Sequence, residues 1–339
     1  MSQTTPAAAA APAASDARRK RWRLWLTVLV TLALLFVLVR EFAGTREFLA
    51  TIAGARAELV ALALLLSAGS VVTSALRWQQ VLRAMSYSLS FGRALHAVLA
   101  SWPISVFTPS RTGDFARALL VRDKVPVFAG AGSVLAEKVI DIQTLLLAAL
   151  LASLSYGARV QAALIFAGIV AEWVVVIGIL RSRQRLLAVR FLAKRREKFE
   201  QLYHAFDALI SRPMQILWVA LGSLVVRLLT VGMVAALLAA AHAGRSYFEL
   251  IAPWMLATLA GLVPITIGGM GTRDAAFAVL LKTTAGVTLS EAAVLAATMG
   301  YSLVAVLSPA LAGLPLLARS GWIGGRESVE PRAERGPRP

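Results

Sequence analysis

The chain has 339 residues, of which 58% are hydrophobic, and its mean hydropathy is +0.71. Several apolar runs are long enough to cross a bilayer, so the composition predicts an all-α, polytopic integral membrane protein without a large soluble domain. The net charge is +17, but the Lys and Arg residues lie mainly just outside the apolar runs. In that position they set topology and contact anionic headgroups, so nucleic acid is not an expected partner.

The first half of the chain is expected to cross the membrane twice and then dip into it. Residues 1–17, rich in Ala and Pro, are predicted to form a disordered tail. A basic cluster precedes the first span, residues 24–39, which places the N terminus in the cytoplasm. The second span, residues 59–76, is expected to end at Arg77. Residues 94–108 are apolar but short, and basic residues follow, which predicts a re-entrant hairpin from the cytoplasmic side.

The rest of the chain is expected to hold four more spans and a second re-entrant hairpin at residues 247–281, entering from outside. These four spans are predicted at residues 127–156, 162–180, 214–241 and 289–317. The basic segment 181–212 has a periodic apolar pattern that predicts a helix lying on the headgroups, with a solvated connector as the alternative. Residues 18–319 would thus form one membrane domain of about six full spans and two hairpins, and residues 320–339 a disordered cytoplasmic tail.

The second hairpin contains the sequence PITIGGMGTRD at residues 264–274, in which three glycines and an Arg–Asp pair interrupt an apolar run. Irregular backbone at membrane depth is tolerated only where it is buried in protein or lines a wet cavity. The candidate substrate-binding residues here are Gly268, Gly269, Gly271, Arg273 and Asp274. The glycines allow positive φ and close approach of an anion to backbone amides. A glycine-rich helix contact is the alternative, although it leaves the Arg–Asp pair unexplained.

The first hairpin carries a similar set of polar residues, Arg111, Asp114 and Arg117. A guanidinium group matches the oxygens of a lipid phosphate, so Arg111 and Arg117 are candidates for binding a headgroup. Asp114 precedes Arg117 by three residues, which predicts that it either pairs with Arg117 or caps the following half-helix. The alternative is a cytoplasmic topology signal with a local ion pair.

Glu137 and Asp141 lie one helical turn apart on a single face of a predicted span. Carboxylates in a span are costly unless they pair with cations or line a wet cavity. Two interpretations follow: they are structural partners of Arg111, Arg117 or Arg273, or they relay protons.

Two further charged residues, Glu172 and Arg227, lie alone in neighbouring spans and are expected to pair with each other. The three histidines have no metal-site spacing, and no nucleotide-hydrolysis motif occurs, so no cofactor or metal is expected.

The two hairpins resemble each other, because residues 109–120 and 269–281 each place a Gly/Arg/Asp break before an apolar half-helix. If one hairpin enters from the cytoplasm and the other from outside, the halves form an inverted repeat with a site between them. Chance similarity of two short segments is the alternative.

Three motifs together resemble a known family: PSRTGD at residues 109–114 with Arg117, EKVID at residues 137–141, and the glycine-rich PITIGGMGTRD. The family is the transmembrane region of lysylphosphatidylglycerol synthases, also called the flippase-like domain family. Its stand-alone members are linked to hopanoid and cell-envelope biosynthesis. The resemblance covers roughly residues 18–319. The chain departs from it at Asp114 and Asp274, where the family usually has Glu, and at Lys138, where it usually has Arg.

The resemblance implies a lipid transporter that moves an anionic phospholipid, hopanoid or polyprenyl-linked lipid between leaflets. The family's aminoacyl-transfer chemistry belongs to a separate soluble domain, which these 339 residues do not contain, so no enzyme activity is expected. The alternative is a membrane-embedded enzyme or accessory subunit of envelope-lipid or glycolipid synthesis. The expected partners are anionic lipids, an envelope-lipid synthase or glycosyltransferase, and a second copy of the chain. The expected location is the bacterial inner membrane, with both termini cytoplasmic.

Overall fold

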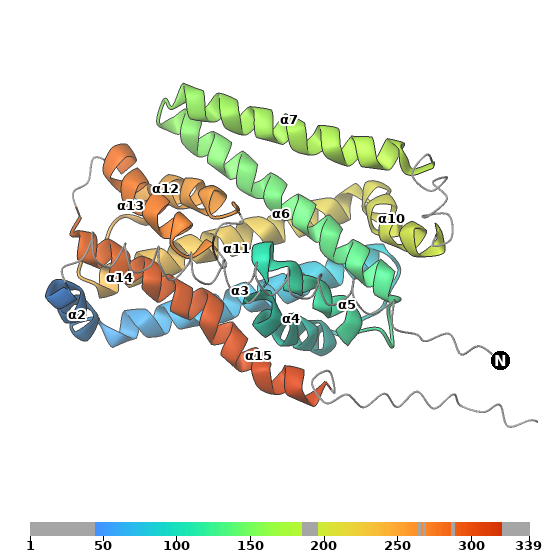
Figure 1. Cartoon of the computed structure of the whole chain (residues 1–339), viewed down its shortest axis with the longest axis horizontal. Coiled ribbons are helices and arrows are strands. Elements are labelled where there is room, and N and C mark those ends of the chain that lie inside the picture. The colour runs from blue at the N-terminus through green and yellow to red at the C-terminus, as the bar shows by residue number, and fades with distance from the viewer. Residues whose placement is uncertain are drawn as a thin grey trace, which may run out of the picture.

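The structure, a computed structural model, describes residues 45–106, 108–184, 196–263, 266, 269–285 and 289–320. The predicted first span at residues 24–39 and the predicted tails, except for Ser320, lie outside these residues. Every regular element in the described ranges is a helix, as the composition predicts (Figure 1). The elements are α2 (Thr45–Ala53), α3 (Ala57–Ala84), α4 (Phe91–Val106), η1 (Pro109–Phe115), α5 (Ala116–Leu120), α6 (Val127–Ser155), α7 (Arg159–Arg181), α10 (Arg196–Ile210), α11 (Pro213–Ala240), α12 (Tyr247–Ala260), α13 (Thr272–Ala285), α14 (Glu291–Ser302), the π-helical η3 (Leu303–Leu307) and α15 (Ser308–Arg319).

Four described helices are long and apolar enough to cross a membrane: α3, α7, α11 and the continuous α14–η3–α15 helix, Glu291–Arg319. The chain is therefore a multi-pass membrane protein. Helix α6 has 29 residues and carries three charged residues in its first half. At 1.5 Å per residue its length of about 43 Å exceeds the bilayer core of about 30 Å.

The second predicted span does not end at Arg77. Helix α3 continues to Ala84, and Trp78, Val81 and Leu82 are fully buried after the arginine. The prediction took an arginine in an apolar run for the end of the span, whereas the helix continues past it for seven residues. In the folded protein this side chain is buried among other helices and has ion-pair partners there.

Two central helices, α3 and α11, run side by side in opposite directions and make the most extensive contact between any two elements (Figure 1). Each is followed by a hairpin and then by a long helix: α4, η1 and α5 precede α6, and α12 and α13 precede α14–η3–α15. The contacts are reciprocal, since α4 packs on α15 and α12 packs on α6. Each hairpin has one internal proline in its first arm, Pro103 in α4 and Pro253 in α12.

The two hairpins are tightly folded, and glycines make this possible. A Cβ at Gly113 would lie 2.4 Å from the backbone N of Ser105, so η1 folds directly back on α4. In the second hairpin, Gly269 has φ +77° and Gly271 has φ +91°. The Cβ of any other residue at Gly269 would lie 2.9 Å from the carbonyl oxygen of Gly261. Glycine is required there both by conformation and by space.

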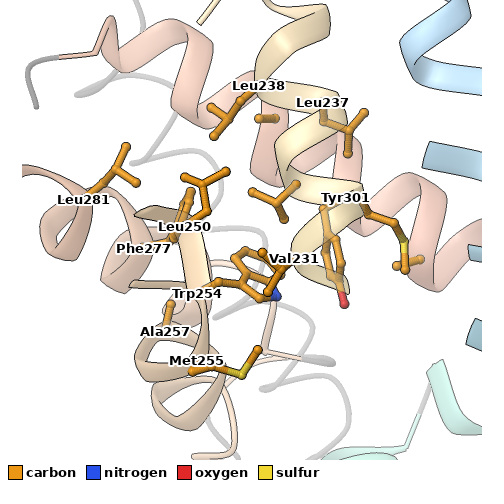
Figure 2. Packing of buried hydrophobic residues seen from close by; sticks show 14 of the residues in the cluster. Val231, Leu237, Leu238, Leu250, Trp254, Met255, Ala257, Phe277, Leu281 and Tyr301 are labelled. Carbon is orange, nitrogen blue, oxygen red and sulfur yellow. The ribbon is translucent and has the colours of Figure 1, made fainter. Parts of the chain in front are cut away.

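The core of the second half surrounds Trp254 of α12 (Figure 2). Its ring packs edge to face against Phe277 of α13, at 5.2 Å between centroids, and against Tyr301 of α14, at 4.6 Å. Such aromatic pairs contribute about 0.5–1.5 kcal/mol beyond the area they bury. The second hairpin is therefore anchored to the long C-terminal helix by three rings.

Helix α10 packs on protein, contrary to the prediction of a helix lying on the headgroups. Its Ala205, Ala208 and Leu209 are buried in a cluster that includes residues of α3 and α6. The helix approaches α6 so closely that a Cβ at Gly132 would lie 2.4 Å from the carbonyl oxygen of Leu202. The apolar face of α10 therefore covers the cluster formed with α3 and α6, a contact that the prediction did not include. The preceding residues 185–195 lie outside the described part of the chain.

The long C-terminal helix contains two prolines, Pro309 and Pro315, and an irregularity lies just before the first of them. The π-helical residues Leu303–Leu307 immediately precede α15, and Pro309 lies in the first turn of that helix. Proline has no N–H to donate to the helical ladder, which favours a local change of hydrogen bonding at this point.

Candidate functional site

A network of buried charges joins α3, the first hairpin, α6 and α11, and Arg77 lies at its centre. Arg77 Nε donates a hydrogen bond to Glu137 Oε1 at 2.8 Å, and its Nη1 donates to Asp141 Oδ1 at 2.7 Å. The same Nη1 donates to Ser223 Oγ of α11 at 2.7 Å. The aliphatic part of the side chain packs against Gly222, where a Cβ would lie 3.4 Å from Arg77 Cβ. Arg77 was not among the predicted site residues.

Glu137 is the most deeply buried carboxylate of this network, with 1% of the residue exposed. Its second oxygen, Oε2, accepts a hydrogen bond from Arg117 Nη1 at 2.9 Å, so two arginines share one carboxylate. The Arg117 guanidinium also lies 5.5 Å from the ring centroid of Trp78, within the range of a cation–π interaction. Trp78 is fixed in turn by donating from Nε1 to Ser133 Oγ at 2.9 Å. The predicted pairing of Glu137 with Arg117 is therefore confirmed.

Asp114 connects the first hairpin to α6. It accepts hydrogen bonds from Lys138 Nζ and from Ser105 Oγ, each at 2.6 Å. Its distance to Arg117 Nη2 is 3.6 Å, which confirms the predicted Asp114–Arg117 ion pair three residues apart. The backbone of Arg111 lies in η1 close by, but its side chain is outside the part of the structure that is described, so its predicted contact is not placed.

Asp141 pairs with Arg77 and with Arg227, whose Nη2 lies 2.8 Å from Asp141 Oδ2. The predicted Glu172–Arg227 pair is therefore wrong. Glu172 lies in α7 and Arg227 in α11, and these helices do not pack extensively on each other: α7 packs on α6, and α11 packs mainly on α3. Neither Glu137 nor Asp141 contacts Arg273, which was one of the partners considered for them.

Among the side chains that the structure describes, the network carries one more positive than negative charge. Four cationic side chains, Arg77, Arg117, Lys138 and Arg227, contact three carboxylates, Asp114, Glu137 and Asp141. In addition, the buried Nε–H groups of Arg117 and Arg227 have no hydrogen-bond partner among the described residues. The network reaches the protein surface at Lys138 and Asp141, whose side chains are 28% and 29% exposed. Its chemistry therefore suits an anion.

The second hairpin has a separate ion pair, Arg273 with Asp274. Arg273 donates from Nε and Nη2 to Asp274 Oδ1, at 3.0 and 2.7 Å, and from Nη2 to Ser302 Oγ at 2.8 Å. Its guanidinium lies 5.3 Å from the ring centroid of Trp254 and 4.5 Å from that of Tyr301. Arg273 is 5% exposed and Asp274 2% exposed. This arginine is thus held from several sides at the start of α13.

The glycines of this break position the pair. Asp274 Oδ2 accepts a hydrogen bond from the Gly271 N–H at 3.1 Å, which uses a free amide at the N-terminus of α13. Gly269 packs against Gly261, the residue that follows α12, and closes the hairpin. The third predicted glycine, Gly268, lies outside the described residues.

The two charged sites are connected through α11. Trp254 Nε1 donates to Thr230 Oγ1 at 3.3 Å, and Thr230 Oγ1 donates to the carbonyl oxygen of Arg227 at 2.7 Å. Thr230 follows Arg227 by one helical turn. Two hydrogen bonds, both through Thr230, therefore link Trp254, which packs on Arg273, to Arg227, which pairs with Asp141.

The sequence contained a signal for the residues that were missed. Arg227 lies in the middle of an apolar run, and the apolar pattern continues beyond Arg77 through Trp78, Val81 and Leu82. An arginine flanked on both sides by buried apolar residues is costly in a membrane unless it has a partner. That cost shows that both residues need a partner, and the structure shows which partner each one has.

Comparison with known proteins agrees with the motifs of both hairpins. No curated protein matches the chain. The sequence model of the lysylphosphatidylglycerol synthase TM region matches residues 24–313, which include both charged sites and all helices from α2 to α14. The chain therefore belongs to the lysylphosphatidylglycerol synthase TM region family.

Proposed function

We propose that the protein moves a lipid with an anionic headgroup between the leaflets of the membrane. The observation that carries this proposal is the unbalanced charge of the network between α3, α6 and α11. A buried positive charge without a counter-charge is costly, and an anionic headgroup supplies the missing charge. Phospholipids, hopanoids and polyprenyl-linked lipids with such headgroups belong to the same substrate class.

The unpartnered donors indicate where the headgroup binds. Arg117 and Arg227 each have a buried Nε–H without a partner among the described residues. Guanidinium groups bind phosphate oxygens through paired N–H donors, and such charge-assisted bonds are the strong ones. Lys138 lies at the exposed edge of the network and is placed to meet the headgroup first. Arg273 is held by Asp274, Ser302 and two rings, so we assign it to positioning the second hairpin.

The carboxylates favour transport over catalysis. General acid–base chemistry requires a group that can exchange a proton with the substrate. Asp114, Glu137 and Asp141 each form ion pairs with two cationic side chains. They are suited to orienting the arginines and to excluding a second anion. An enzyme or accessory subunit of envelope-lipid synthesis is the alternative, and formation of a new lipid by the purified protein would favour it.

The reciprocal packing of the two halves supports an inverted repeat. The path α3, hairpin, α6 has its counterpart in α11, hairpin, α14–η3–α15, and the central helices run in opposite directions (Figure 1). Transporters built in this way bind their substrate near the repeat interface. We propose that the first hairpin faces the cytoplasm and the second the outside of a bacterial inner membrane, with both termini cytoplasmic. Movement would be passive or coupled to an ion gradient.

The test is leaflet exchange in liposomes that contain the purified protein, with fluorescent anionic and zwitterionic phospholipids. The wild type is expected to exchange the anionic lipid faster. Arg227→Gln removes the excess charge and is expected to lose this preference. The double variant Arg227→Gln/Asp141→Asn restores one net positive charge and is expected to regain part of it, while Arg77 keeps Glu137 and Ser223 as partners.

The matched control is Arg93→Gln, which removes an arginine from an exposed ion pair with Asp123 outside the network. It is expected to exchange lipids as the wild type does. Equal exchange of both lipids by the wild type, or an unchanged preference in Arg227→Gln, would contradict the proposal. Thermal stability of each purified variant separates loss of binding from loss of folding.

A further inference from the structure

One carboxyl group in the membrane region has no role in the networks described above. Glu172 lies in α7, and both of its carboxylate oxygens are buried without a hydrogen-bond partner among the described residues. A third buried oxygen without a partner, Gln143 Oε1, lies in α6. The three oxygens are all acceptors while Glu172 is ionised, so in this arrangement none of them donates to another; the donors of Gln143 are on its Nε2 atom.

The packing of α6 and α7 brings these oxygens to the same level. The two helices are antiparallel and joined by the short connection at residues 156–158. A Cβ at Gly168 of α7 would lie 4.0 Å from Leu146 Cδ2 of α6. Glu172 lies one turn after Gly168 in α7, and Gln143 lies one turn before Leu146 in α6, so both are one turn further from the connection. Helix α7 packs most extensively on α6 (Figure 1), so α6 is the described helix that lies nearest to Glu172.

No cation of α6 is left to stabilise an ionised Glu172. Helix α6 carries three charged residues, Glu137, Lys138 and Asp141, and each is paired with a residue outside α7. The charged residues of α7 other than Glu172 are Arg159 and Arg181, at its two ends. An unpaired carboxylate at membrane depth is costly, and one bound proton removes both the charge and the shortage of donors.

We propose that Glu172 binds a proton and donates it in a hydrogen bond to Gln143 Oε1, forming a proton-binding site between α6 and α7. The proton comes from water on one side of the membrane and is released to water on the other, so no further reactant is needed. The coupling role of the site rests on the proposed lipid movement. Gln143 lies two residues from Asp141 on α6. Loss of the proton breaks the hydrogen bond between α7 and α6. The resulting movement of α6 changes the position of Asp141 in the headgroup network.

Infrared spectroscopy of the purified protein in lipid tests the protonation without any transport assay. At neutral pH the wild type is expected to show the carbonyl stretch of a protonated carboxylic acid. The band should be absent in Glu172→Gln and should change position in Gln143→Leu, which removes the acceptor. The control Glu58→Gln removes an exposed carboxylate at the start of α3 and should keep the band. The proposal would be overturned if the spectra of the wild type and of Glu172→Gln showed the same bands in the region of protonated carboxylic acids.

Leaflet exchange under an imposed pH gradient tests the coupling. The wild type and Glu58→Gln are expected to respond to the gradient, and Glu172→Gln is expected to lose the response. A response to a sodium gradient with none to a pH gradient would overturn the assignment of a proton, because the same oxygens suit a sodium ion. Absence of any exchange by the wild type would contradict the proposed function and the coupling role together. The infrared band would then still establish the protonated carboxyl.

Discussion

Arg227 of α11 and Asp141 of α6 form an ion pair with 2.8 Å between Nη2 and Oδ2, and the other oxygen of Asp141 lies 2.7 Å from Nη1 of Arg77 in α3. One carboxylate thus joins three long helices. Any change in the relative positions of α3, α6 and α11 has to break or rebuild these contacts. In a transporter of inverted halves, this makes Asp141 a point where movement of the helices and the charge of the site are linked.

Arg77 is expected to be essential for stability. Replacing it by Met keeps the packing against Gly222 but leaves Glu137 buried without one of its two arginines. Removing one partner of a buried ion pair typically costs about 3–5 kcal/mol. The free energy of unfolding, measured by denaturation in mixed detergent and lipid micelles, should fall by about this amount. Arg77→Met with Glu137→Gln should recover part of the loss, and a single variant as stable as wild type would contradict the network.

The Arg273–Asp274 ion pair of the second hairpin is also expected to stabilise the fold. Arg273→Gln leaves the buried carboxylate of Asp274 with the Gly271 amide as its remaining described partner. We expect a loss of about 3–5 kcal/mol in the free energy of unfolding, and a smaller loss when Asp274→Asn is added. The Trp254 ring lies against the Arg273 guanidinium. The chain has eight tryptophans, so the change in Trp254 fluorescence is taken as the part that disappears when wild type and variant both carry Trp254→Phe. Unchanged fluorescence and stability in Arg273→Gln would show that the pair is unimportant.

Close packing of α10 on α6 predicts an unusual sensitivity at Gly132. In Gly132→Ala the new Cβ would lie 2.4 Å from the carbonyl oxygen of Leu202, so α10 must move away. Overpacking of this kind costs about 1–3 kcal/mol. The matched control is Gly178→Ala in α7, where no atom lies within 4 Å of the new Cβ. The melting temperature should fall in the first variant and stay or rise slightly in the second; equal melting temperatures would refute close contact.

The proposed orientation can be tested by labelling, because the chain has no cysteine and single cysteines can be introduced without background. Lys124 lies before α6 and Ser246 lies before α12, and both side chains are exposed. In whole cells a membrane-impermeant thiol reagent should label Ser246→Cys. It should label Lys124→Cys only after the membrane is opened. The reverse result would invert the proposed topology.

Several elements were predictable because their signals are local. The lengths of the apolar runs located α6, α7 and α11 to within a few residues, since a span needs about 20 apolar residues whatever surrounds it. The two hairpins were recognisable because glycine, proline and charge interrupt an apolar run. The pairs Asp114–Arg117 and Glu137–Arg117 were also anticipated, the first because three residues separate its members on one helix face.

The sequence by itself determined that this is a helical, multi-pass membrane protein of the lysylphosphatidylglycerol synthase TM region family, because hydropathy and motif spacing are properties of the chain alone. Only the tertiary structure decided which charges meet. Arg227 was expected to pair with Glu172, and it pairs with Asp141 instead. The choice depends on how each helix is rotated and on which neighbours it packs against. Those are set by close contacts such as α3 on α11, between residues far apart in sequence.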